Sequence, residues 1–553
     1  MSLVVEAHKS LINVGLRAAS NAFVTHLPTG IHGQDRVQKY VERAQTRLEH
    51  PSLHEPKSLL DGQVVAIKDN IWTARFPTSC ASGILQGFQS PRDANVVNAL
   101  EQAGAMVIGK TNMDEFGMGS HSTNSYKGGV RNNAVPGLHR SAGGSSGGSA
   151  MAVLNGQCRI ALATDTGGSV RLPAAYTGLI GFKPSYGRLS RHGVVPYANS
   201  LDTVGIIGKD AEDILRTFRQ LDRPDTNDPT CINAATRRRI ADLKSARYRQ
   251  RSGSTIRLIR KPSPQRVENS NFPVDRRRRY PGLVGRTDWA QVIGVPAEYN
   301  IAELSDSVRE AWNRTLSQLD ARGHTIVPIS LPTTKAALSA YYVLAPAEAS
   351  SNLAKYDGIR YGVRCSNSET QPDQTPTSPL YSHTRGAGFG DEVKRRILLG
   401  TYSLSSAGIN NYFIQAQKIR RLVQREFDSV FSLPNPLRTH TITPLTETGV
   451  DYIICPTAPT PPPRLIDLKS STPFDAYMND VLTVPASLAG LPAISVPAPV
   501  APESRYTDFA NVGIQVIGQY GDDEALVRFV HVELQATDKE VRHYKRWRKK
   551  RFL

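Results

Sequence analysis

The chain has 553 residues, a mean hydropathy of −0.34 and a formal net charge of +18. Its length allows a large buried core, and its apolar runs are too short and too often interrupted to span a bilayer. The positive charge suggests a nucleic-acid partner, but residues 237–286 contain 16 Lys/Arg against 3 Asp/Glu. Most of the excess therefore lies in one tract, and the rest of the chain is close to balanced.

The five cysteines are far apart, odd in number and without a C-x-x-C spacing. They are Cys80, Cys158, Cys231, Cys365 and Cys455. This pattern indicates reduced, mostly buried thiols in a cytosolic or organellar compartment rather than a disulfide framework or a zinc site. We therefore expect no metal site in this chain.

Helical and strand-like patterns alternate from the beginning of the chain. Residues 3–17 interleave apolar residues with two basic ones, which fits either a weak amphipathic transit segment or an ordinary first helix. Residues 62–67 form a strand-like run that ends at Lys68. Residues 93–103 have helical spacing, and residues 105–108 again resemble a strand.

The same alternation continues around two glycine-rich loops. The first loop, at 143–149, leads into a small-residue helix predicted over 149–155. A strand predicted over 159–163 then runs into the second loop, at 165–171. Repeated strand–loop–helix units of this kind predict an α/β sheet with helices on both faces and active loops at the strand ends.

The pattern changes after residue 231. Residues 232–286 are rich in arginine and lack apolar periodicity, so we expect a basic, disordered insertion there. A strand follows at 292–296, and a Thr-, Pro- and Ser-rich loop is expected at 366–379. Helices are predicted over 305–322, 335–354 and 415–431, and a basic tail over 543–553.

The two loops and the early lysine together suggest acyl-transfer chemistry. The loops read Gly-Gly-Ser-Ser-Gly-Gly-Ser at 143–149 and Asp-Thr-Gly-Gly-Ser-Val-Arg at 165–171. A serine nucleophile needs a base and amide donors for its oxyanion, and a neutral Lys68 can act as that base. A flexible linker is the ordinary alternative for one Gly/Ser run. Residues 104–111 also match a phosphate-binding pattern, but their apolar middle reads as a strand instead.

On these motifs the chain resembles the amidase signature family, including the distance of 24 positions between Ser145 and Ser169. The resemblance implies an amidase signature fold, a central mixed β-sheet flanked by helices on both faces, as a single domain over 1–553. It implies Lys68 as the terminal base, Ser145 as a bridging serine after a cis peptide bond, and Ser169 as the nucleophile. The oxyanion hole implied by the resemblance consists of backbone N–H groups of Thr166, Gly167 and Gly168, together with that of Ser169.

Further segments resemble one branch of that family, the A-type subunits of the glutamyl-tRNA(Gln) amidotransferases. These segments are 112–120, 348–353, 356–362, 392–397, 399–401, 479–480 and 487–492. The resemblance implies that Arg396 holds the α-carboxylate of glutamine, Asp480 its α-ammonium group, and Tyr341 lines the pocket. A fixed cation and a fixed anion suit a zwitterionic substrate. Judged by position alone, a surface helix charge is the favoured reading of Arg396 and a helix-capping carboxylate that of Asp480, and the local match to this branch is what favours substrate binding.

This branch releases ammonia from glutamine for a partner subunit that converts Glu-tRNA(Gln) to Gln-tRNA(Gln). It implies a B-type and a small C- or F-type partner subunit, ATP and Mg on the partner, no cofactor in this chain, and the mitochondrial matrix. A stand-alone amidase acting on a small or uncharged amide is the alternative. A non-catalytic RNA-binding or scaffold role rests only on the basic tracts, which could also hold tRNA electrostatically.

Overall fold

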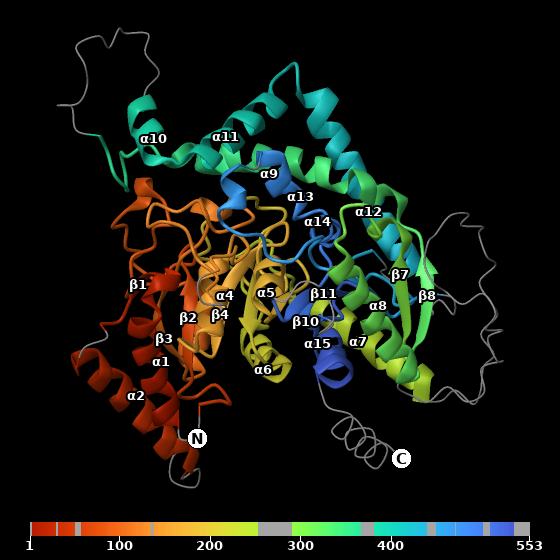
Figure 1. The fold of residues 1–553 in the computed structure, drawn as a ribbon, viewed down its shortest axis with the longest axis horizontal. Helices are drawn as coiled ribbons and strands as arrows, with labels where there is room; N and C mark the ends of the chain where they lie inside the picture. Colours follow the sequence, from red (N-terminus) through yellow and green to blue (C-terminus); the bar gives the residue numbers. More distant parts are fainter. Residues whose placement is uncertain are drawn as a thin grey trace.

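The computed structural model describes residues 3–28, 31–49, 57–133, 138–252, 290–365, 381–438, 449–470, 472–500 and 509–535. These residues contain an eleven-stranded sheet with the strand order β1-β3-β2-β4-β6-β5-β10-β11-β9-β7-β8 (Figure 1). The strands are β1 (Phe23–His26), β2 (Val64–Lys68), β3 (Met106–Thr111), β4 (Ile160–Asp165), β5 (Ile180–Lys183), β6 (Thr203–Gly208), β7 (Val292–Pro296), β8 (Thr325–Ile329), β9 (Tyr452–Pro456), β10 (Ala493–Pro499) and β11 (Asn511–Gly518).

The α-helices vary from short turns near the site to long helices that cross one side of the molecule. They are α1 (Leu3–Leu16), α2 (Ile31–Glu49), α3 (Asn95–Gln102), α4 (Gly147–Leu154), α5 (Arg171–Thr177), α6 (Ala211–Leu221), α7 (Ala234–Ser252), α8 (Asp306–Ala321), α9 (Ala337–Asn352), α10 (Ser382–Gly388), α11 (Asp391–Leu404), α12 (Ile414–Val430), α13 (Pro473–Met478), α14 (Val484–Ala489) and α15 (Asp523–Phe529). Two π-helical segments, Ile409–Phe413 and Val530–Gln535, adjoin α12 and α15.

The sheet is mixed, as predicted. Strand β2 runs parallel to β3 and β4, and β7 runs parallel to β8 and β9. The remaining strand pairs are antiparallel. Strands β2, β3 and β4 are buried along their whole length, which explains their continuous apolar runs.

Helices cover both faces of the sheet, and the glycines of two strands show which helix lies on which face. In β11, a Cβ on Gly513 would lie 2.2 Å from Ala175 of α5, whereas one on Gly518 would face Leu526 of α15. Positions an odd number apart in a strand point to opposite faces. In β6, likewise, Gly205 faces the start of α5 and Gly208 faces α6. Thus α5 lies on one face, and α6 and α15 on the other.

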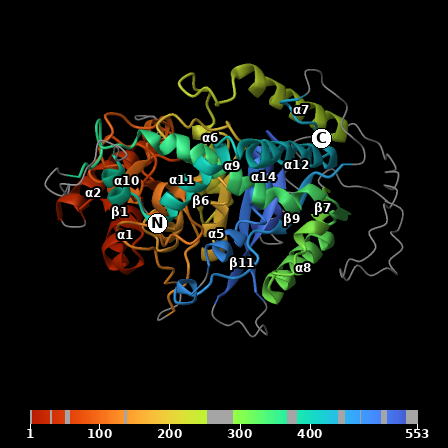
Figure 2. The same ribbon diagram turned by 90° about the horizontal axis from the view of Figure 1, so that it is seen from above.

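Three long helices, α9, α11 and α12, lie side by side in both views of the ribbon (Figures 1 and 2). The contact between α9 and α11 is very close at Gly400, because a Cβ there would be only 1.9 Å from the carbonyl oxygen of Pro346. Only glycine allows α11 to cross α9 at this distance. This helical layer carries Tyr341 and Arg396, two of the predicted substrate-binding residues.

Most of the predicted elements are confirmed within one to three residues. The strand ending at Lys68, the helix after the first glycine loop and the strand before the second are β2, α4 and β4. The helices predicted over 305–322, 335–354 and 415–431 are α8, α9 and α12. The strand predicted over 105–108 extends to Thr111.

The prediction of a disordered insertion over 232–286 is wrong for residues 234–252, which form α7. Ile240 and Leu243, three positions apart, are buried, and a Cβ on Gly521 would lie against Ile240. Two buried apolar side chains are enough to dock this helix, although they are too few among the arginines to give an apolar periodicity in the sequence. The rest of that tract, the loop expected at 366–379 and the tail at 543–553 lie outside the described residues.

The first helix forms part of the fold, since α1 buries Ala7, Leu11 and Val14. Among the helices of the described residues, none is long and apolar enough to cross a membrane.

Candidate active site

The site is built where two parallel strands end. Strands β2 and β4 are hydrogen-bonded neighbours, and Lys68 and Asp165 are their last residues. Because the carboxyl ends of parallel strands lie at the same edge of a sheet, the loops that follow them meet there. This arrangement places Lys68 beside the start of the second loop, where its Nζ reaches the carbonyl oxygen of Thr164. The first loop follows neither strand: it precedes α4 and is held at the end of β3, where the N–H of Gly148 donates to the carbonyl oxygen of Asn112 at 3.1 Å.

Lys68 is fully buried and points its amine at the first glycine loop. Its Nζ lies 2.7 Å from Ser145 Oγ and 2.8 Å from Ser146 Oγ, and it also reaches the carbonyl oxygen of Thr164 at 3.4 Å. Burial lowers the pKa of Lys68 to about 7, although Asp114 and Asp165 act to raise it. An amine with this pKa is available in its neutral form and can accept a proton.

Ser145 is placed by the loop that precedes α4. The peptide bond between Gly144 and Ser145 is cis, as predicted. Asp114 supports this turn from behind: its N–H donates to the carbonyl oxygen of Ser145 at 3.1 Å, and a Cβ on Gly144 would lie 2.3 Å from its carboxylate. The first loop is therefore an ordered part of the core and not a flexible linker.

Ser169 lies in the loop between β4 and α5. From residue 160 to residue 177 every residue is buried except Ser169, which is half-buried. Within the described part of the chain, the backbone N–H groups of Thr166, Gly167, Gly168 and Ser169 have no hydrogen-bond acceptor. A half-exposed hydroxyl beside unused amide donors is the arrangement that a nucleophile and an oxyanion hole require.

Both glycines of the second loop are needed for close contacts. A Cβ on Gly167 would lie 2.6 Å from the ring of Tyr341, and one on Gly168 would lie 2.3 Å from Thr483 Oγ1. Tyr341 is buried and lies against the loop, in agreement with its predicted place in the pocket. Thr166 is fixed from the other side, where its hydroxyl donates to Asp202 at 2.6 Å.

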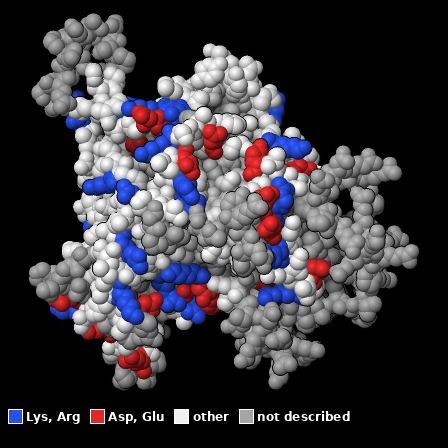
Figure 3. Space-filling view, in the orientation of Figure 1, with Lys and Arg blue, Asp and Glu red and all other residues white. Residues whose placement is uncertain are grey.

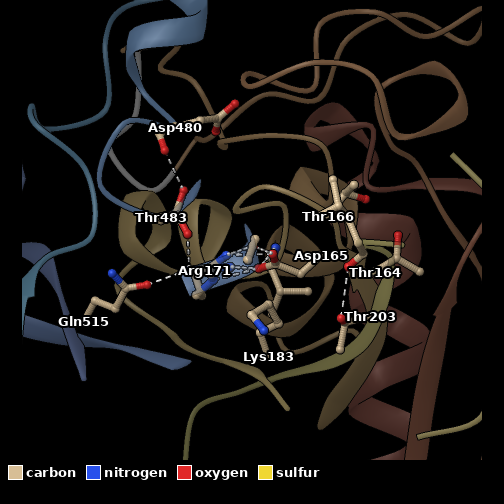
Figure 4. A network of polar contacts seen from close by, with 12 residues as sticks. Thr164, Asp165, Thr166, Arg171, Lys183, Thr203, Asp480, Thr483 and Gln515 are labelled. Carbon is tan, nitrogen blue, oxygen red and sulfur yellow. Dashed lines mark hydrogen bonds and ion pairs between the residues drawn. The ribbon is translucent and has the colours of Figure 1, made fainter. Parts of the chain in front are cut away.

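A buried ion pair fixes the base of this loop (Figure 4). The guanidinium of Arg171 binds both carboxylate oxygens of Asp165 at 2.8 and 2.9 Å, and donates to Gln515 and to the carbonyl oxygen of Thr483. Burial acts to raise the pKa of Asp165, but the charge and hydrogen bond of Arg171, with Lys183 and the N–H of Val170, together outweigh it and the pKa falls. Thr483 in turn donates to the carbonyl oxygen of Asp480, so one network joins the second loop to the predicted ammonium site.

Arg396 is buried on α11 and is not a surface charge. Its Nε donates to Glu392 at 2.8 Å and its Nη1 to the hydroxyl of Tyr197 at 2.7 Å. The guanidinium also lies 5.3–5.7 Å from the ring centroids of three tyrosines. These are Tyr197, Tyr342 and Tyr477. Such an aromatic box stabilises the cation, and Nη2, which makes no hydrogen bond within the described residues, stays available to a substrate carboxylate.

Asp480 is buried as well, and its carboxylate does not cap a helix. It accepts hydrogen bonds from Ser120 and from the hydroxyl of Tyr342, both at 2.9 Å. Burial raises the pKa of Asp480 to about 6, against the effect of these two donors. The neighbouring Asn479 contacts His121, which follows Ser120. Residues 479–480 are therefore joined to residues 120–121 by two hydrogen bonds.

The structure thus joins Lys68 to Ser145, and Tyr341 to the second loop, while the contact from Ser145 to Ser169 and the roles of all these residues stay predictions. Sequence reasoning missed Ser146, although it stands beside Ser145 in the motif. It also missed the tyrosines around Arg396, because they come from separate segments. The phosphate-loop alternative for 104–111 is excluded, since these residues enter the buried strand β3 and Lys110 bonds Thr78.

The chain matches the family model "Amidase" over residues 36–271 and 253–527. Together these matches cover most of the chain, which therefore belongs to the amidase family. Its relatives include the mitochondrial A-type subunit of the glutamyl-tRNA(Gln) amidotransferase of Coccidioides posadasii, with 52% identity over 95% of this chain and 98% of the relative. The protein of the same name in Emericella nidulans is 49% identical over 96% of this chain and 98% of the relative.

Solved structures agree with this assignment. The A-type subunit of the glutamyl-tRNA(Gln) amidotransferase of Thermotoga maritima is 31% identical, covers 90% of this chain and 94% of its own, and superposes with a TM-score of 0.61. A crystal structure of an amidase, at 24% identity and a TM-score of 0.66, shares the fold.

Proposed function

We propose that this chain is the glutamine-hydrolysing, A-type subunit of a mitochondrial glutamyl-tRNA(Gln) amidotransferase. The observation that carries the proposal is that two buried opposite charges, Arg396 and Asp480, both contact Tyr342. Asp480 is also linked to the loop of Ser145, because it accepts from Ser120, whose carbonyl oxygen accepts the N–H of Gly144. A zwitterionic amino acid needs both charges, and a simple amide needs neither. The names and coverage of the relatives point to the same activity and to the mitochondrion.

In the proposed complex with substrate, Arg396 binds the α-carboxylate of glutamine and Asp480 binds its α-ammonium group. These two contacts direct the side-chain amide toward the second loop, with Tyr341 against the aliphatic part. Fixing both ends of a small substrate in this way lowers the entropic cost of reaching the reactive geometry.

The reaction then proceeds by two acyl transfers. Neutral Lys68 accepts a proton from Ser145, which accepts the proton of Ser169 as its oxygen attacks the amide carbon. The N–H groups of residues 166–169 bind the oxyanion. The proton returns along the same path to the leaving nitrogen, which departs as ammonia. Water then attacks the glutamyl ester, with the relay again taking and returning a proton, and glutamate leaves.

The ammonia passes to a partner subunit that amidates Glu-tRNA(Gln). The relatives are named as subunits of an amidotransferase, which supports a complex. We propose a B-type subunit and a small C- or F-type subunit as the partners, with ATP and Mg bound by the partner and the complex in the mitochondrial matrix. Within the described residues there is no cluster of metal-binding side chains.

Neither alternative gains support. A stand-alone amidase acting on an uncharged amide has no use for the buried Arg396 and Asp480, and relatives with about half of the residues identical are amidotransferase subunits. A purely RNA-binding role would favour a basic surface. On the face shown in Figure 3, basic and acidic side chains of the described residues are interspersed.

The test is glutamate release from glutamine by the complex purified with its partners. Ser169→Ala removes the nucleophile and leaves the fold intact, so we expect a loss of at least about 10³-fold in kcat. Ser317→Ala, on the outer surface of α8 where its hydroxyl bonds only Asn313, is the control and should be unchanged. Normal turnover by Ser169→Ala would refute the mechanism.

A further inference from the structure

The helix that carries Arg396 has no side-chain cap of its own. Its N-cap residue is Gly390, which has an extended backbone and no side chain to accept from the first turn. The first backbone N–H groups of a helix need acceptors from elsewhere, and an anion there is favourable. For one of these groups, the N–H of Gly390 itself, the acceptor is the carboxylate of Glu115 from a distant loop.

Glu115 is buried and holds three segments together. Its Oε2 accepts the N–H of Gly390 at 2.7 Å, and its Oε1 accepts the hydroxyl of Ser82. A Cβ at position 390 would lie 2.4 Å from Oε2, so glycine is what allows the carboxylate to reach the backbone. The next residue, Phe116, packs edge-on against Phe389, which extends the contact by one residue on each side.

This contact fixes one end of α11, and Gly400 fixes the other. Arg396 lies between them, about one and a half turns from Gly390 and about one turn from Gly400. At Gly400 the backbone of α11 touches that of α9, which carries Tyr341 and Tyr342. A shift of α11 along its axis would therefore move the guanidinium relative to the aromatic box and to Asp480.

We propose that Glu115 is a positioning residue for substrate binding: its carboxylate caps α11 in trans and thereby sets the place of Arg396. The inference rests on the proposed function, because Arg396 has a substrate to bind only if that substrate carries a carboxylate. It adds a residue whose own side chain touches neither the substrate nor the Lys68 relay.

The test is steady-state glutaminase kinetics of the complex with Glu115→Gln, which keeps the shape of the side chain and removes its charge. We expect KM for glutamine to rise about three- to thirtyfold while kcat stays nearly constant. Burial raises the pKa of Glu115 to about 7, so the assay is run above that pH to keep the wild-type group ionised. Ser82→Ala, which leaves the bond to Gly390 in place, should raise KM less.

A matched control separates positioning from general loss of a cap. Asp210 accepts from the N–H of Glu212 and caps α6 on the far side of the sheet, so Asp210→Asn is the same chemical change away from the site. It should leave KM unchanged. In an Arg396→Lys background, Glu115→Gln should add little further increase, because both changes act through the same guanidinium.

Three results would overturn the inference. They are an unchanged KM in Glu115→Gln, a parallel fall of kcat and thermal stability with no selective effect on KM, and a KM increase that is fully additive with Arg396→Lys. If the wild-type complex itself released no glutamate, the proposed function would fail first. A failure of the inference alone is therefore recognised by an active wild type together with any one of these three results.

Discussion

Lys68 and Arg396 are both buried cations of one site, yet their surroundings are opposite. Lys68 contacts two hydroxyls and a carbonyl oxygen, and its pKa falls to about 7. Arg396, whose guanidinium stays charged in any protein environment, contacts the carboxylate of Glu392 and lies among three tyrosine rings, which offset the cost of its burial. Burial alone thus does not decide what a basic residue does. A buried lysine without a hydrogen-bonded carboxylate loses its charge readily, which suits the predicted role of Lys68 as a base, whereas an arginine keeps its charge, which suits the predicted role of Arg396 in binding a carboxylate.

The largest expected effect tests the base. Lys68→Met keeps the length and apolar stem of the side chain but removes the amine, so kcat should fall by roughly 10²–10⁴-fold, the usual value of general base catalysis. KM should change little, because the charges that bind glutamine are intact. The measurement is glutamate release under saturating glutamine, with Lys418→Met on α12 as the control. A variant that kept its kcat would show that the amine is structural.

The next effect is the pH profile, which separates the two cations without a substitution. Below a pH of about 7 the amine of Lys68 is protonated and cannot accept a proton, so kcat/KM should fall about tenfold per pH unit. Above that pH the profile should level off. Below about 6, protonation of Asp480 should steepen the fall, since a neutral carboxyl binds an ammonium group weakly. A profile that is flat through 7 contradicts the role of Lys68.

The smallest of the three expected effects tests the proposed binding of the substrate carboxylate by Arg396. Arg396→Ala should raise KM for glutamine roughly 10- to 100-fold, the worth of one charge-assisted contact, with a modest change in kcat. Arg396→Lys should recover only part of the loss, since lysine cannot make the paired bonds or stack on the rings. Initial rates over a wide range of glutamine concentration give both constants. The comparison fails if Arg396→Ala lowers kcat as strongly as Lys68→Met does.

The reacting side of the site could be predicted because it is encoded locally. Lys68 ends an apolar strand and Ser145 and Ser169 each follow a glycine, so the sequence marks all three as candidates, while their separate roles are implied by the family resemblance and stay predictions. The cis bond before Ser145 is implied by the family resemblance and is present. The contact from Lys68 to Ser145 comes from the tertiary fold, because the loop of Ser145 precedes α4 and reaches the end of β2 from a distant part of the chain.

The binding side could not be derived in the same way. The rings around Arg396 come from positions 197, 342 and 477, and only the tertiary fold brings them together. The helical pattern of α11 does not reveal that the side of the helix that carries Arg396 is buried against other parts of the chain. The helix α7 was missed for a related reason: its two buried apolar residues among those described, Ile240 and Leu243, are too few to form a helical pattern, and only the surface on which they dock explains them.

The position of the N-terminal segment has a consequence for maturation of the protein. The carbonyl oxygen of Ala22 accepts the N–H of Asn112 at 2.8 Å, and a Cβ on Gly148 would lie 2.6 Å from that same oxygen. The backbone at residue 22 therefore packs directly behind the helix that follows the first serine loop. If a processing peptidase removed the residues up to and including Ala22, the buried side of α4 would be exposed to water. Any cleavage compatible with activity must therefore leave residue 22 in place.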